Sequence, residues 1–265
     1  MGKLGNSLPT YEHVLFKSSN LELCVVQIKY PPVQRFSDEQ YLTGIKEALA
    51  EDYPLTSEER GINILVTPQG VNPAPGAVVH RFNSIDFRWS VVLTSESIAL
   101  ETREYTDFEE LSARFDKLVR HVAKYFCPHY QLRLGIRYIN EFRHHDGDTY
   151  EVWHRLLNKE LVSSATQTVV GGRVEQTINE VRIRRDDGIL LVRHGFLNGT
   201  TVLPILHHPA KNGPFYLLDL DYYDETSIEF EESAPTEKIR DYNDVLYRVF
   251  RWSIGEGELY QQLRG

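Results

Sequence analysis

Side chains with binding chemistry gather in one stretch near the middle of the chain. Residues 131–142 read QLRLGIRYINEF, and their alternation is typical of a strand with two different faces. Around Tyr138, the residues Arg137, Asn140 and Glu141 supply a guanidinium fork, an amide and a carboxylate. This set could hold a small polar or anionic ligand. Alternatively, Arg137 pairs with a carboxylate on a neighbouring strand and Asn140 caps a turn.

Two aspartates lie on a later predicted strand. The segment LDLD separates Asp219 and Asp221 by one residue, so both point to the same face of the strand. The two carboxylates could hold a hard cation or act as an acid/base pair. They could also face Arg137 across the sheet, and we favour this ion pair. The predicted ligand-binding residues are therefore Arg137, Tyr138, Asn140, Glu141, Asp219 and Asp221.

Motifs for metal binding and catalysis are weak. The run His144-His145-Asp146-Gly147-Asp148 is compact, but it lacks the His-x-x-x-His spacing that directs two imidazoles to one side of a helix. It therefore predicts a solvated turn, and His207-His208-Pro209 predicts a loop in the same way. The sequence has no Gly-x-Ser-x-Gly nucleophile motif and no Gly-rich phosphate loop. We predict no metal, no cofactor and no catalytic residue, and a non-enzymatic protein is favoured.

The charge balance restricts the class of partner. Lys and Arg number 29 against 38 Asp and Glu, a net charge of −9, so the chain offers no overall basic field for binding phosphates. A local basic group of Arg182, Arg184, Arg185 and Arg193 falls on a predicted hairpin, whereas residues 219–241 are strongly acidic. Opposite local charges favour either docking within the chain or head-to-tail and dimer contacts. The partner expected is a protein or a second copy of the chain, and nucleic acid is not favoured.

Residue usage also indicates the compartment. The N-terminus lacks a charged segment followed by an apolar core, and no apolar run approaches the roughly 18 residues of a membrane span. Cys24 and Cys127 have no partner at metal-binding spacing, so they are expected to be reduced and to be buried as small hydrophobic side chains. We therefore expect a cytoplasmic protein with no membrane segment.

The elements that position these residues follow from periodicity. After a leader segment, residues 1–20, alternation predicts strands over 21–30, 61–66, 78–83, 87–94 and 97–103. Capping-box patterns and apolar stripes predict helices from Ser37 to before Pro54 and from Thr106 to Phe126. A Pro- and Gly-rich loop is expected over 68–76.

The remaining chain repeats this order of elements. Strands are predicted over 131–142, 166–177, 180–185, 189–197 and 214–223, with a hairpin turn at Asp186-Asp187-Gly188. Helices are predicted over 150–161 and 235–254. The fold expected is α+β, with two similar β-α-β4-α halves at residues 21–130 and 131–265, antiparallel sheets, and long helices packed on one face.

Two resemblances follow from this order and from short motifs. The β-α-β4-α order resembles the half-unit of TATA-binding-protein-like folds, which implies a DNA-binding sheet that the acidic charge disfavours, and also resembles helix-grip folds, which implies a ligand pocket. The chain is also similar to a sporadically distributed, uncharacterised family of bacterial proteins of about this length. The motifs that carry this similarity are Pro31-Pro32, Tyr53-Pro54, Phe82-x-Ser84-x-Asp86, Tyr105 to Phe108, Leu134-Gly135-Ile136-Arg137-Tyr138-Ile139-Asn140 and Leu218-Asp219-Leu220-Asp221.

The second resemblance implies no settled activity, and the sporadic distribution of that family suggests defence-associated or toxin-neutralising roles. We expect a non-enzymatic binding module that contacts a protein or neutralises a toxin. The alternative is a sensor that binds a small polar or anionic ligand on the sheet face. A metal-dependent hydrolase using Asp219 and Asp221, or an RNA-binding protein using the basic hairpin, is expected less.

Overall fold

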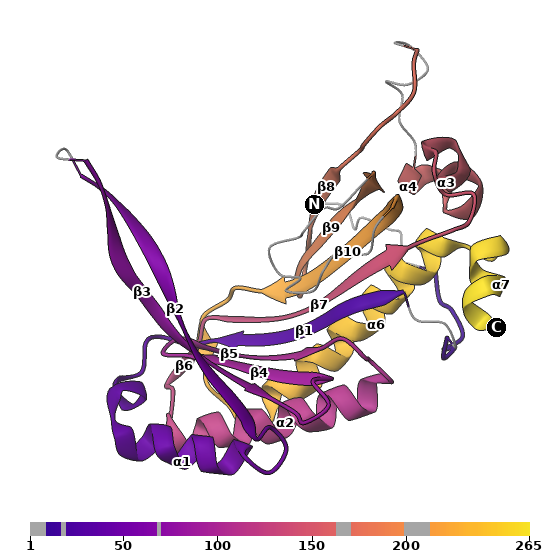
Figure 1. Ribbon diagram of the computed structural model, residues 1–265. Helices are drawn as coiled ribbons and strands as arrows, with labels where there is room; N and C mark the ends of the chain where they lie inside the picture. Colours follow the sequence, from indigo (N-terminus) through magenta and orange to yellow (C-terminus); the bar gives the residue numbers. More distant parts are fainter. Residues whose placement is uncertain (1–8, 17–19, 68–69, 163–170, 199–212) are drawn as a thin grey trace. The chain divides into compact units, whose positions relative to one another are not determined.

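The computed structural model describes residues 9–16, 20–67, 70–162, 171–198 and 213–265 (Figure 1). It confirms the predicted class, a mixed α+β protein with a large antiparallel sheet and helices. Nine strands are hydrogen-bonded in the order β2-β3-β4-β5-β1-β7-β10-β9-β8. The chain forms two compact units, one of residues 1–23, 137–222 and 241–265 and the other of residues 24–136 and 223–240.

The elements have the following bounds. The earlier part of the chain contains β1 (Leu21–Lys29), the 3-10 helix η1 (Gln34–Ser37), α1 (Glu39–Leu49), β2 (Leu55–Thr67), β3 (Gly70–Asn83), β4 (Trp89–Thr94), β5 (Ser97–Thr102), α2 (Phe108–Tyr125), β6 (Tyr130–Gln131) and β7 (Arg133–Phe142). The later part contains α3 (Tyr150–Leu156), α4 (Lys159–Val162), β8 (Asn179–Arg185), β9 (Gly188–Leu197), β10 (Phe215–Asp224), β11 (Ile228–Glu229), α6 (Ala234–Ile254) and α7 (Glu258–Arg264).

Helix α2 anchors the core of the unit built from residues 24–136 and 223–240. The predicted apolar stripe is confirmed, because each of its members is buried: Phe108, Leu111, Phe115, Leu118, Val119, Val122 and Phe126. The N-cap is Asp107 rather than the predicted Thr106, since the Asp107 carboxylate accepts the Glu110 N–H at 2.8 Å. Helix α1 packs closely on α2, because a Cβ at Gly44 would lie 2.6 Å from the Tyr125 ring.

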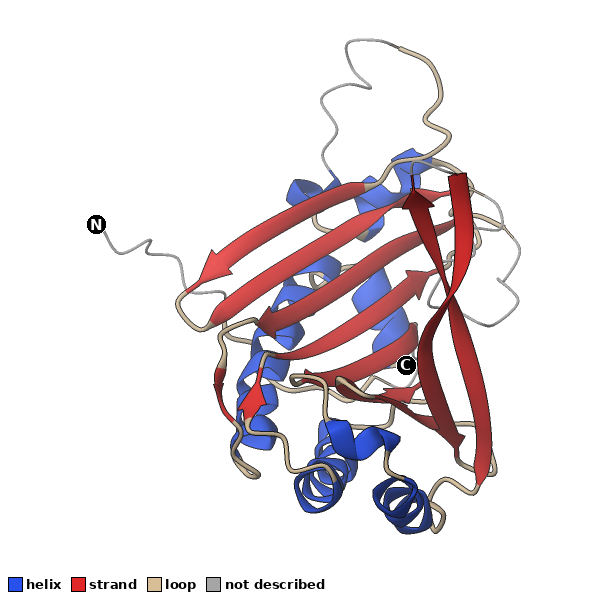
Figure 2. Cartoon of the chain, turned by 90° about the vertical axis from the view of Figure 1, so that its left-hand side faces the viewer, coloured by secondary structure: helices blue, strands red, loops and turns tan. Residues whose placement is uncertain are grey.

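Strands β2 and β3 form a ribbon that is longer than predicted. The expected loop at 68–76 is wrong: β3 begins at Gly70, which pairs with Thr67. Pro73 and Pro75 are tolerated within β3 because β4 pairs only with His80–Asn83, so the outer edge of the earlier residues has no neighbouring strand that needs their N–H. The ribbon extends beyond β4 and β5 (Figure 1), and its two strands twist around each other (Figure 2).

The second part of the chain departs from the prediction in three places. The strand expected over 131–142 is divided at Leu132 into β6, which pairs with β11, and β7, which belongs to the nine-stranded sheet. The helix expected over 150–161 is two short helices, because the Asn158 side chain accepts the Glu160 N–H at 3.0 Å and starts α4. The strand expected over 166–177 is not confirmed: residues 166–170 lie outside the described residues, and 171–177 form no strand. Gly171 and Gly172 have φ values of 69° and 99°, which a strand does not accommodate.

The other predicted elements of this part form as expected. Strands β8, β9 and β10 match three predicted strands, and the hairpin closes between Arg185 and Gly188. Helix α6 matches the predicted final helix, and Gly255 follows it with φ of 59°, the conformation that ends many helices. Residues 241–254 of α6 also hold part of the N-terminal segment, where the Val14 N–H donates to Tyr247 Oη at 2.8 Å.

The burial of Phe115 gives the first test. Replacing it with Ala removes a fully buried ring from α2, so the free energy of unfolding should fall by about 3–5 kcal/mol. The exposed Lys124, on the same helix, is the matched control. Lys124→Ala should change the free energy of unfolding by no more than about 0.5 kcal/mol. Chemical denaturation of both variants measures the difference, and equal midpoints would contradict the assigned core.

Candidate functional site

A buried ion pair joins the two predicted polar stretches. Arg137 on β7 donates from Nε to Asp219 Oδ1 at 2.7 Å and from Nη2 to Asp219 Oδ2 at 2.6 Å on β10, the two-bond geometry that a guanidinium favours. The Asp219 side chain is 3% exposed and that of Arg137 is 22% exposed. Burial alone lowers the pKa of Arg137, but the hydrogen bonds and charge of Asp219 outweigh it, and the pKa is raised.

The ion pair continues across two further strands. Arg193 on β9 donates from Nη1 to Asp219 Oδ2 at 3.1 Å, and from Nε and Nη2 to Glu180 Oε2 on β8 at 3.0 and 2.6 Å. Glu180, Arg193, Asp219 and Arg137 therefore alternate in charge across four neighbouring strands. We call these four residues the charged row. Sequence reasoning anticipated the pairing of Arg137 with an aspartate, but not the role of Arg193.

The remaining predicted site residues divide between the two faces of the strands. Tyr138 and Asn140 alternate with Arg137 and so point away from the charged row. Tyr138 Oη donates to Asn243 Oδ1 on α6 at 2.8 Å, and Asn140 Nδ2 donates to the Leu218 carbonyl at 3.2 Å. Tyr138 therefore connects β7 to α6, and Asn140 connects β7 to β10.

Glu141 and Asp221 lie on the same face as the charged row. Glu141 is 6% exposed and accepts a hydrogen bond from Arg143 Nη2 at 3.0 Å. Arg143 also covers the Phe215 ring, with 4.8 Å between its guanidinium carbon and the ring centroid. Asp221 is partly exposed, and its charge contributes to the raised pKa of Arg137. The face is therefore covered by arginine side chains, each of which has a carboxylate partner: Arg137 with Asp219, Arg193 with Asp219 and Glu180, and Arg143 with Glu141.

The histidine cluster forms the predicted turn. Residues 145–148 are a turn, and the His145 and Asp146 side chains are 76% and 55% exposed. One ligand atom from each of His144, His145 and Asp146 lies within 4.8 Å of the others. His144 Nδ1 accepts the Asp146 N–H at 3.2 Å, and its Nε2 lies 3.2 Å from Glu258 Oε1. Both ring nitrogens of His144 are thus in use. The run His207-His208-Pro209 lies outside the described residues.

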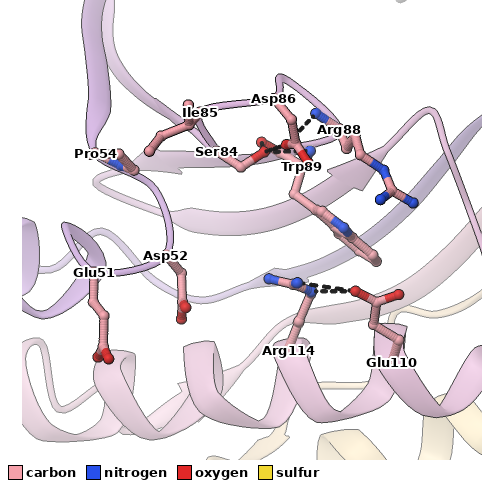
Figure 3. A pocket seen from close by; sticks show the side chains of 10 residues that line it. All are labelled: Glu51, Asp52, Pro54, Ser84, Ile85, Asp86, Arg88, Trp89, Glu110 and Arg114. Atoms are coloured by element: carbon pink, nitrogen blue, oxygen red, sulfur yellow. Dashed lines mark hydrogen bonds and ion pairs between the residues drawn. The ribbon is translucent and has the colours of Figure 1, made fainter.

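A pocket of about 330 Å³ opens beside the turn between β3 and β4 (Figure 3). Its floor is Trp89, which is 2% exposed and carries the Arg114 guanidinium 4.6 Å from its ring centroid. Arg114 also donates from Nε and Nη2 to Glu110 Oε1 at 3.1 and 3.0 Å. The rim has more carboxylates than guanidinium groups, with the lining formed by Glu51, Asp52, Pro54, Ser84, Ile85, Asp86, Arg88, Trp89, Glu110 and Arg114.

The turn at the edge of this pocket presents two large apolar side chains to solvent. Ile85 is 77% exposed and Phe87 is 64% exposed. Phe87 has φ of 57°, a left-handed conformation that costs a residue with a Cβ roughly 1–2 kcal/mol. Asp86 holds the turn, because its Oδ1 accepts from Ser84 Oγ at 2.6 Å and from the Arg88 N–H at 3.1 Å. These bonds keep the pKa of Asp86 below its usual value.

Sequence reasoning missed this turn as a binding feature. The sequence predicts a strand over 87–94 that includes Phe87, but β4 begins at Trp89. The available signal was composition, since a tight turn normally carries Gly, Asn or Asp at a positive φ, and here two bulky apolar residues flank Asp86.

Comparison with known proteins adds no residue roles. The chain matches no family model, and a search of curated proteins finds no similar sequence. Among the helices of the described residues, none combines the length and the apolar character needed to cross a membrane.

Removing one partner tests the charged row. Arg137→Ala leaves the buried Asp219 carboxylate with only Arg193, so the free energy of unfolding should fall by about 2–5 kcal/mol. In the double variant Arg137→Ala/Asp219→Ala, the free energy of unfolding should fall by less than the sum of the decreases in the two single variants. Arg248→Ala, which removes the surface pair with Asp244, is the control and should cost about 1 kcal/mol or less. Urea unfolding measures these free energies. If the decrease in the double variant equals the sum of the two single decreases, Arg137 and Asp219 are not energetically coupled.

The conformation of Phe87 gives a second test. Gly adopts a positive φ without a steric cost, so Phe87→Gly should be more stable than Phe87→Ala by about 1 kcal/mol. At Ile85, where φ is not positive, the order should reverse, because Gly costs about 0.5–1 kcal/mol more than Ala. Thermal unfolding of the four variants measures both differences, and the same order at both positions would overturn the assigned conformation of Phe87.

Proposed function

We propose that the protein is a non-enzymatic binding module that contacts another protein through the turn Ser84–Arg88. The observation that supports this most directly is Phe87: its ring is 64% exposed and its backbone is held at φ of 57°. Packing within the described part of the chain leaves most of the ring exposed, while hydrogen bonds within the turn hold the backbone. A partner that buries the ring would supply the missing stabilisation.

The energetics of such a contact are those of an interface hot spot. Burying a side chain such as Ile85 or Phe87 stabilises by about 1.5–3 kcal/mol each, and a few large side chains commonly supply most of the binding energy of an interface. The turn is also fixed in the free protein by the Ser84, Asp86 and Trp89 hydrogen bonds. Little conformational entropy is therefore lost when it docks.

The surrounding charges indicate the chemistry of the partner. Glu51, Asp52 and Asp86 lie around the pocket next to Ile85 (Figure 3). A partner with an apolar cleft and a rim of Lys or Arg would match both the turn and these carboxylates. A toxin-neutralising or defence-associated role is part of this proposal, and it depends on the identity of that partner.

The test compares the wild-type chain with an Ile85→Ser/Phe87→Ser variant. A partner recovered with the wild-type chain is purified, and its dissociation constant is measured for both forms. The double variant should weaken binding by about 2 kcal/mol or more, roughly 30-fold, and binding to the wild type should weaken as salt increases. Ile228→Ser, at a residue of the same unit that is 37% exposed, is the matched control. Equal affinities for the wild-type and double-variant chains would refute the proposal.

The alternative, a sensor for a small polar or anionic ligand on the charged row, has less support. Arg137 would be the anion-binding group, yet its Nε and Nη2 both donate to Asp219. An incoming anion would therefore compete with a buried carboxylate for the charge of this guanidinium.

A further inference from the structure

Strand β8 is an edge strand of the nine-stranded sheet, and it is exposed along its whole length. All seven of its residues, Asn179–Arg185, are exposed, and β9 is its one neighbour in the strand order of the described residues. An outer strand carries backbone N–H and C=O groups that can pair with another chain. The strand therefore offers a docking edge in the unit that does not contain the Ser84–Arg88 turn.

The pairing with β9 shows which backbone groups face this edge. The Thr177 N–H donates to the Phe196 carbonyl at 2.8 Å, and the same register continues from Asn179–His194 to Arg185–Gly188. Hydrogen-bonded and non-hydrogen-bonded pairs alternate along an antiparallel ladder. Odd-numbered residues of β8 therefore bond to β9, and the N–H and C=O groups of Ile178, Glu180, Arg182 and Arg184 point outward.

The outward residues are self-complementary in one antiparallel register. If two copies pair around a two-fold axis through Val181, each Glu180 lies opposite Arg182 of the second copy, and each outward residue meets an outward residue. Moving the axis to Glu180 or to Arg182 places two like charges opposite each other, which is unfavourable. Because Glu180 uses Oε2 for Arg193 and a carboxylate can accept several hydrogen bonds, the intramolecular pair and the new pair are compatible.

The apolar residues of β8 favour the same contact. Val181 and Ile183 are 47% and 43% exposed, although they lie opposite Val192 and Leu190, which are 7% and 4% exposed. Ile178, at the start of the outward set, is 54% exposed. A second β8 would cover Val181 with its own symmetry mate.

We propose that two copies of this chain pair through β8 in this register, so that their sheets join edge to edge in a two-fold symmetric dimer. We assign a second copy, rather than an unrelated peptide, to this edge for two reasons. In the register centred on Val181, Glu180 of each copy lies opposite Arg182 of the other, and the outward backbone groups of both copies face each other. The inference does not depend on the proposed function, since it uses other residues in the other unit.

Disulfide trapping tests the register. In a Cys127→Ser background, which removes the exposed native thiol, Val181→Cys places two thiols opposite each other in a non-hydrogen-bonded pair. The Cα atoms there are about 4.5 Å apart, within the range that a disulfide spans. Ile183→Cys is the matched control, because the two copies of residue 183 would be roughly 14 Å apart along the strands. Efficient cross-linking at 181 and little at 183, under mild oxidation, is the expected result.

Charge exchange gives an independent readout. Glu180→Arg puts arginines opposite Arg182 of the second copy, and Arg182→Glu puts glutamates opposite Glu180, so each variant alone should be monomeric in native mass spectrometry while the wild type is dimeric. An equimolar mixture should form a heterodimer, because every cross-strand pair then has opposite charges. Thermal unfolding confirms that each variant is folded.

Three outcomes would overturn the proposal: a monomeric wild-type chain at the highest soluble concentration, equal cross-linking at 181 and 183, or a mixture that stays monomeric. An Ile85→Ser/Phe87→Ser variant should remain dimeric. Loss of the dimer in that variant would assign self-association to the turn instead, and would also overturn the proposal.

Discussion

Burying an ionised carboxylate is costly unless a positive charge lies beside it. At Asp219 that charge comes from arginines on both neighbouring strands, and the arrangement of these strands depends on it. Its two oxygens receive Arg137 from one neighbouring strand and Arg193 from the other. A slip of either strand by one residue would turn its arginine to the opposite face, and a buried charge without its partner is strongly destabilising. The charged row therefore favours one register of β7, β10 and β9, in addition to the burial of their apolar side chains.

This role changes how the polar residues of residues 131–142 are understood. In the sequence these residues look like a ligand-binding site, because a guanidinium group, an amide and a carboxylate lie close together. In the structure each has an intramolecular partner: Arg137 pairs with Asp219, Asn140 with the Leu218 carbonyl, and Glu141 with Arg143. The described part of the chain instead leaves large apolar side chains mostly exposed, among them Ile85 and Phe87 at the turn between β3 and β4. The sequence stretch that is richest in chemistry and the surface that is best suited to binding are thus different places.

Local patterns predicted those elements whose stability is local. The stripe of α2 and the Asp186-Asp187 turn are set by residues close in sequence, and both were recovered. The loop expected at 68–76 failed because proline opposes a strand only where a neighbour needs its N–H, and strand order is a tertiary property. The break at Asn158 also has a distant cause, since its N–H donates to Ser253 and its side chain to the Trp252 carbonyl. Arg193 and the exposure of Phe87 depend on tertiary neighbours in the same way.

The two compact units are interleaved along the chain, and this has a consequence for how the protein is made. One unit takes its residues from the beginning, the middle and the end of the sequence, and the bond from the Val14 N–H to Tyr247 Oη joins residues 233 positions apart. During synthesis the segment around Val14 therefore lacks its partner helix until Tyr247 has been added, 233 residues later. The same unit contains β8 with its exposed edge, so a nascent chain presents that strand before α6 has been synthesised.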